Sequence, residues 1–98
     1  MEKGFTNAHV LLDSRMSAAA RGDADALYDL GICYSTGAAG VGIDLIAAHK
    51  WFNLAAVAGS PAAHHARAEV AEDMTAREIV EAQRQARAWL GETRRLAA

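Results

Sequence analysis

Histidines are the side chains of this sequence that most readily suggest chemistry, and their spacing limits what they can do. His64 and His65 are adjacent, and neighbouring residues of a helix point about 100° apart, so the two cannot chelate one metal ion as an i, i+4 pair would. The chain contains neither a His-Glu-x-x-His nor a Cys-x-x-Cys spacing. We therefore expect no metal and no cofactor, with His64, His65, His49 and His9 on helix surfaces.

The single cysteine and three aspartates are the other candidates for reactivity. Cys33 falls on the apolar side of a predicted helix, where a free cysteine behaves as a small hydrophobic residue, and no histidine is placed to activate it. Asp23, Asp25 and Asp29 resemble a cation cluster. However, Asp23 is placed to cap a helix, and carboxylates near a helix N-terminus are stabilised by its dipole. We expect a solvated acidic turn and no catalytic residue.

Length, composition and charge describe one small domain. The chain has 98 residues, of which 24 are alanine and only 6% are aromatic, so helices that approach closely are favoured over a sheet. The net charge of −2 and the lack of a basic stripe argue against nucleic-acid binding. No apolar run approaches the ~20 residues that span a bilayer, and the start does not resemble a signal peptide. We expect a cytoplasmic protein that binds no membrane.

Capping residues and glycines divide the chain into five predicted helices. The first begins at Thr6 or Asn7 and ends at Gly22. The others start after Asp23, after Asp44, after Ser60-Pro61 and at the capping box Thr75-Ala76-Arg77-Glu78. The segment 35–44 contains three glycines and is predicted to be a turn, and Gly91 is predicted to end the last helix, leaving a frayed tail. No segment has the alternation of a strand.

Two helix starts recur 37 residues apart, at Gly22 and at Gly59, which indicates stacked helix–turn–helix units. The segment 26–63 resembles the Sel-1-like repeat, a relative of the tetratricopeptide repeat, whose pattern is A-x-x-x-L-G-x-x-Y-x-x-G-x-G-V followed by D-x-x-x-A-x-x-W-[YF]-x-x-A-A-x-x-G. The matching residues are Ala26, Leu30, Gly31, Tyr34, Gly37, Gly40, Val41, Asp44, Ala48, Trp51, Phe52, Ala55, Ala56 and Gly59. The resemblance implies an all-α, short α/α solenoid of about five antiparallel helices in a right-handed superhelix.

The match is good over only one repeat. The glycine turn carries one extra residue, and Arg67 and Ala68 stand where the pattern has Leu-Gly. We divide the single domain, residues 1–98, into a degenerate half-repeat (6–22), the best repeat (23–59), and a degenerate second repeat with a C-terminal cap (60–98). Gly31 lies inside a helix, where glycine costs about 1 kcal/mol, so a close helix crossing is expected there. Trp51 and Phe52 are expected to fill the space between helices.

One helix face is a candidate for binding. Five residues of the second predicted helix follow one another at helical spacing and form what we call the outer stripe: Asp25, Tyr28, Asp29, Ile32 and Thr36. In the fold that the resemblance implies, this helix lines the concave face. An apolar pair framed by aspartates is typical of a partner site, although Tyr28 and Ile32 could equally pack against neighbouring helices.

The function that the resemblance implies is that of a non-catalytic adaptor, not an enzyme, which binds a peptide or protein partner on its concave face. Two alternatives stay open. Solenoids of fewer than three repeats are seldom stable alone, so the chain could be a homo-oligomer whose helices serve self-assembly. A small enzyme or a metal- or ligand-binding protein that uses the histidines is the third possibility.

Overall fold

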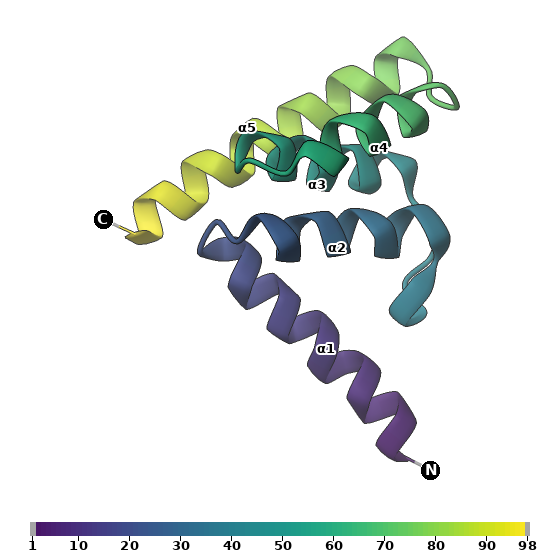
Figure 1. The fold of residues 1–98 in the computed structure, drawn as a ribbon, viewed down its shortest axis with the longest axis vertical. Coiled ribbons are helices and arrows are strands. Elements are labelled where there is room, and N and C mark those ends of the chain that lie inside the picture. The colour runs from purple at the N-terminus through teal and green to yellow at the C-terminus, as the bar shows by residue number, and fades with distance from the viewer. Residues whose placement is uncertain (1, 98) are drawn as a thin grey trace.

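Residues 2–97 form five α-helices joined by short turns, with neighbouring helices packed against each other (Figure 1). This computed structural model describes the backbone of residues 2–97 and the side chains of residues 10–95. The helices are α1 (Glu2–Ala20), α2 (Ala24–Thr36), α3 (Leu45–Val57), α4 (Pro61–Ala71) and α5 (Ala76–Ala97), and a short 3-10 helix, η1 (Ala38–Gly40), follows α2. The predicted all-α class is confirmed, and the described backbone contains no strand.

The predicted helix starts are confirmed at four of the five helices by capping hydrogen bonds. The Asp23 carboxylate accepts from the backbone amides of Asp25 and Ala26, at 2.9 and 3.2 Å. The side chains of Asp44 and Ser60 cap α3 and α4 in the same way. At α5 the capping box is complete: the Thr75 amide donates to the Glu78 carboxylate at 2.8 Å, and the Glu78 amide donates to the Thr75 hydroxyl at 3.1 Å.

Two helix boundaries differ from the prediction. The first helix starts at Glu2, so Thr6 and Asn7 lie within it and do not cap it. The last helix continues through Gly91 to Ala97. A glycine ends a helix where the chain needs a left-handed residue, as at Gly22 (φ 85°) and Gly37 (φ 80°), but Gly91 keeps a negative φ. A glycine inside a helix is about 1 kcal/mol less favourable than an alanine, and the rest of α5 outweighs this cost.

Helix α3 is the centre of the fold, because α2, α4 and α5 all pack against it. Its Trp51, Phe52 and Ala55 are buried, as the repeat pattern predicts. Where α2 crosses α3, the Phe52 ring lies directly against the backbone of Gly31, and a Cβ at Gly31 would stand 2.4 Å from the ring. The crossing is therefore possible only because residue 31 has no side chain. This explains a glycine in the interior of α2.

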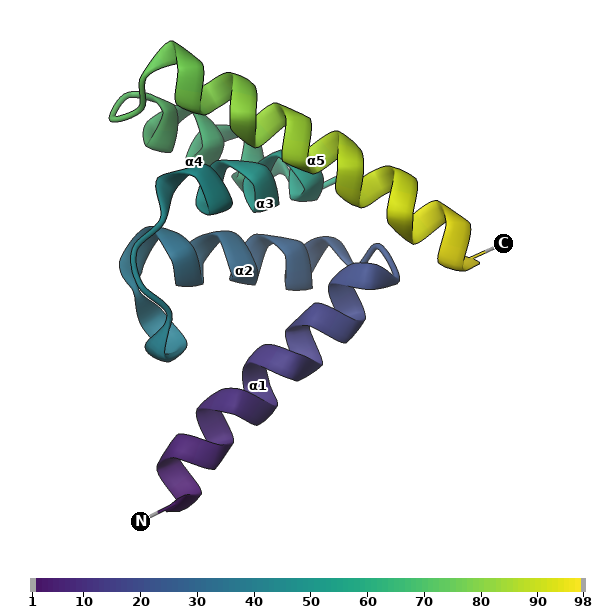
Figure 2. The same ribbon diagram turned by 180° about the vertical axis from the view of Figure 1, so that it is seen from behind.

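The C-terminal cap is joined to α3 by aromatic contacts. The Trp89 ring of α5 meets Trp51 edge to face, with centroids 4.9 Å apart and planes at 80°. The ammonium of Lys50 lies 4.4 Å from the Trp51 centroid and 5.4 Å from that of Trp89, at cation–π distance. Burial lowers the pKa of Lys50, and the negative charge of Glu92 partly opposes this shift. Figure 2 shows α5 lying along the bundle and extending beyond it.

Substitution of two glycines should have opposite effects. We expect Gly31→Ala to lower the free energy of unfolding by about 1–3 kcal/mol, because the methyl group would overlap the Phe52 ring. Gly91→Ala meets nothing within 4 Å and should raise it by about 0.5–1 kcal/mol. Urea unfolding followed by circular dichroism measures both. Equal effects of the two substitutions would contradict the close crossing at Gly31.

Removal of the Trp89 ring should weaken the cap. We expect Trp89→Ala to lower the free energy of unfolding by about 3 kcal/mol, because the edge of Trp51 and the stem of Lys50 lose their cover. Trp89→Phe keeps an aromatic ring and should cost less. An unfolding midpoint of Trp89→Ala that equals the wild-type value would show that this ring does not hold α5 on α3.

Candidate functional site

The outer stripe lies along α2, and its residues differ in their solvent exposure and in their contacts with the rest of the protein. Asp25 and Thr36 are exposed, and 36% of Ile32 is accessible. The Thr36 hydroxyl donates to the Ile32 carbonyl at 2.8 Å, so this hydroxyl is used within the helix. Ile32 is therefore the apolar side chain of the stripe that is most available to a partner.

The other two members of the stripe contact neighbouring helices. Tyr28 is half-buried, with its ring centroid 5.5 Å from that of Phe52 on α3. The Asp29 carboxylate accepts a hydrogen bond from Nε of Arg15 on α1, at 3.3 Å. The Tyr28 side chain is thus occupied by packing against Phe52, and the Asp29 side chain by its ion pair with Arg15. Neither kind of contact occupies the side chain of Ile32.

The Arg15–Asp29 ion pair shows which face of α1 adjoins the stripe. Leu11 precedes Arg15 by one helical turn, so the two side chains share a face of α1. Leu11 is 52% exposed, although it is large and apolar. Ile32 follows Asp29 by three residues on α2. Two exposed apolar side chains on different helices, Leu11 on α1 and Ile32 on α2, therefore each lie about one helical turn from the same ion pair, a feature that sequence spacing within a single helix does not reveal.

The residues with reactive side chains take structural positions. Cys33 is buried as a free thiol, as expected. His64 and His65 are exposed on α4, and the side chain of His9 lies outside the described residues. No group of three or more His, Cys, Asp and Glu side chains that could hold a metal ion occurs among residues 10–95.

His49 is buried, and the expectation that it lies on an outer face is wrong. It is 4% exposed, and its Nδ1 has no hydrogen-bond partner. The reason is that α4 covers this side of α3: Arg67 of α4 donates to the Asn53 side chain, one turn after His49, and also approaches His64 Nδ1 at 3.4 Å. Burial, and secondarily the positive charge of Arg67, lower the pKa of His49, so its imidazole is neutral at pH 7 in the folded protein.

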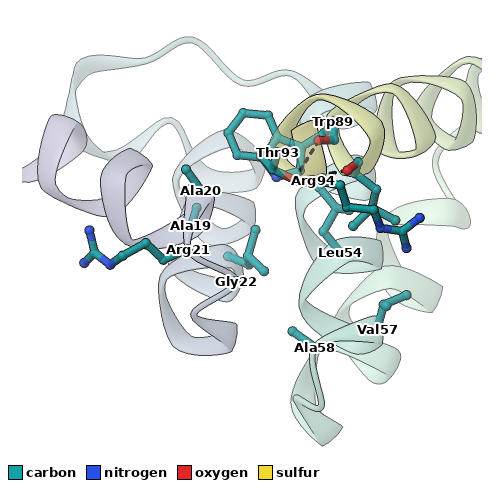
Figure 3. Close-up of a pocket in the computed structure, with 12 residues that line it drawn as sticks. Ala19, Ala20, Arg21, Gly22, Leu54, Val57, Ala58, Trp89, Thr93 and Arg94 are labelled. Atoms are coloured by element: carbon teal, nitrogen blue, oxygen red, sulfur yellow. Dashed lines mark hydrogen bonds between the residues drawn. The ribbon is translucent and has the colours of Figure 1, made fainter. Parts of the chain in front are cut away.

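A pocket of about 360 Å³ lies where three distant parts of the chain meet (Figure 3). Its sides are the α1–α2 corner, the end of α3 and the C-terminal part of α5. Leu27 and Leu54 contribute buried apolar surface, and Trp89 forms part of one wall. Sequence reasoning missed this pocket, because its residues are separated by up to 75 positions and no short motif connects them.

The chain matches no protein-family model, no curated protein and no solved structure at a significant level. Within the part of the chain that the structure describes, no helix is both long and apolar enough to cross a bilayer.

The buried His49 should make the stability of the protein depend on pH. Its pKa in the folded state is below the ordinary value of 6.5. As the pH falls below about 6.5, the unfolded chain binds a proton at this residue and the folded protein does not. The free energy of unfolding should then fall, by at most about 1.4 kcal/mol per pH unit, until the pH reaches the folded-state pKa. Urea unfolding at pH 7.5 and 5.5 measures the change.

A variant without this imidazole provides the control. His49→Phe should flatten the dependence between pH 7.5 and 5.5, whereas the exposed His65→Gln should leave it. If the free energy of unfolding of His49→Phe declines between pH 7.5 and 5.5 as much as that of the wild type, groups other than His49 cause the decline.

Proposed function

We propose that this protein is a non-catalytic adaptor of the Sel-1-like repeat type, which binds a protein or peptide partner through the outer stripe and the adjoining face of α1. The observation that carries the proposal is the exposure of Leu11 and Ile32, each about one helical turn from the Arg15–Asp29 ion pair that joins α1 to α2. Exposed apolar side chains rimmed by charged groups are typical of interaction sites.

The arrangement of the stripe supports this proposal in two further ways. Tyr28 is held by Phe52, and Asp29 is held by Arg15, so the helical turn that precedes Ile32 is ordered before a partner arrives. A preordered surface loses less conformational freedom on binding. The proposal includes action in a reducing compartment such as the cytoplasm, because the only cysteine is a buried free thiol.

A single charge at the centre of the stripe tests the proposal. Ile32→Asp should abolish retention of the partner in affinity capture from a lysate of the source cell, because the partner would have to bury an unpaired carboxylate. The fold should persist, since Ile32 is already 36% exposed. Circular dichroism and an unfolding midpoint establish that the variant is folded.

The matched control is Val80→Asp, which places the same charge on an exposed apolar site of α5 that is 60% accessible. A protein that is retained by the wild type and by Val80→Asp, and lost with Ile32→Asp, would support the adaptor function. Identical retention by all three proteins would contradict it. If the only species lost is a second copy of this chain, the stripe serves self-assembly instead.

A further inference from the structure

The pocket between the α1–α2 corner and α5 has a composition suited to binding an apolar group. Leu27 and Leu54 are each 3% exposed and supply its inner surface, and Trp89 and Leu90 of α5 line it beside them. Its volume of about 360 Å³ lies within the range usual for ligand sites, about 300–1,000 Å³. The pocket is not part of the outer stripe: Leu27 and Ile32 are five residues apart on α2 and point in different directions.

Apolar surface also continues out of the pocket. Val57, at its edge, is 69% exposed, which is among the highest values for a large apolar side chain in the described residues. The neighbouring Ala58 and Ala20 are exposed as well. A small molecule that fills the pocket would leave this rim in water, whereas a polypeptide that lies across the opening would cover it.

Two arginines give the opening a positive charge. Arg21 of the α1–α2 corner and Arg94 of α5 both line the pocket, and both are exposed. In Figure 3 their guanidinium groups point away from each other, on opposite sides of the pocket. The lining contains no acidic residue, and neither arginine forms an ion pair within the described residues.

We propose that this pocket binds an acidic peptide segment, in which a bulky apolar side chain enters the pocket and carboxylates on either side of it pair with Arg21 and Arg94. Guanidinium groups favour carboxylates because two N–H groups can donate to one carboxylate together. A single small carboxylate cannot reach both guanidinium groups, since they lie on opposite sides of the opening, but a peptide with acidic residues before and after the apolar one can. This inference uses a different surface from the outer stripe and goes beyond the proposed function.

A synthetic peptide of this pattern provides the test. The probe is acetyl-Glu-Glu-Leu-Phe-Glu-Glu-amide, titrated at low salt into the isotopically labelled full chain and followed by amide and indole NMR shifts. We expect the largest shifts at Gly22, Ala58 and the Trp89 indole, because these residues line the pocket. The analogue with glutamine in place of every glutamate should bind at least about tenfold more weakly, since it lacks the charges.

Charge reversal on the protein supplies the second arm. The double variant Arg21→Glu with Arg94→Glu should weaken binding of the acidic probe about tenfold or more, whereas Arg87→Glu, an exposed arginine of α5 outside the pocket, should leave it nearly unchanged. Equal affinity for the two peptides, or an equal loss with Arg87→Glu, would overturn the proposal. NMR shifts centred on Ile32 would also overturn the pocket proposal, but they would support partner binding by the outer stripe. The two hypotheses can therefore be rejected independently.

A second copy of the chain is the competing occupant, because its segment 69–73 has a similar pattern, with the exposed Glu69, Glu72 and Asp73 around the half-buried Val70. Sedimentation velocity of the protein alone, over a range of concentrations, separates the cases. If the protein is a monomer, and the NMR signals of the pocket residues do not change with protein concentration, the result supports a peptide partner. Pocket signals that change as a dimer dissociates on dilution would overturn the peptide assignment.

Discussion

The contact between the Phe52 ring and the Gly31 backbone is the constraint on which the rest of this small fold depends. It sets how closely α2 and α3 cross, and a single methyl group at residue 31 would stand 2.4 Å from the ring. Among the described side chains, Phe52 is also one of the two largest that are fully buried, and its ring supports Tyr28 on the other helix. Close packing in a protein interior leaves no free volume to absorb a change at such a point. One pair of residues thus couples the core to the surface that we propose binds a partner.

Small side chains extend the same principle to the other helices. Ala48, Ala55, Ala63, Ala82 and Ala86 are at most 2% exposed. Alanine contributes little hydrophobic burial, but it permits α4 and α5 to approach α3 closely, and the resulting contacts gather α2, α4 and α5 around one central helix. With the apolar sides of these helices turned toward α3, Ile32 on the outer face of α2 remains accessible. The exposed face is therefore a consequence of how the core is organised.

The long α5 creates the second feature of the surface. Edge-to-face contact between Trp89 and Trp51 holds α5 on α3, and the helix then continues past Gly91, beyond the end of the bundle (Figure 2). This extension places Thr93 and Arg94 opposite the α1–α2 corner and forms the pocket. Had α5 ended at Gly91, as the glycine alone predicts, Arg94 would not stand beside the pocket. An uninterrupted helix is therefore what brings the second arginine to the opening.

Local chemistry in the sequence determined the all-helical class, the starts of four helices, and the turns at Gly22 and Gly37, because capping and left-handed glycines act over only a few residues. The same local periodicity placed the five residues of the outer stripe on one face of α2. The tertiary structure alone decided which of them are available to a partner, since Arg15 of α1 pairs with Asp29 and Phe52 of α3 packs against Tyr28. It also decided the burial of His49 beneath α4, against the expectation of a surface position, and the pocket that joins the α1–α2 corner to α5. These features depend on contacts between residues far apart in the chain, and no spacing within one helix encodes them.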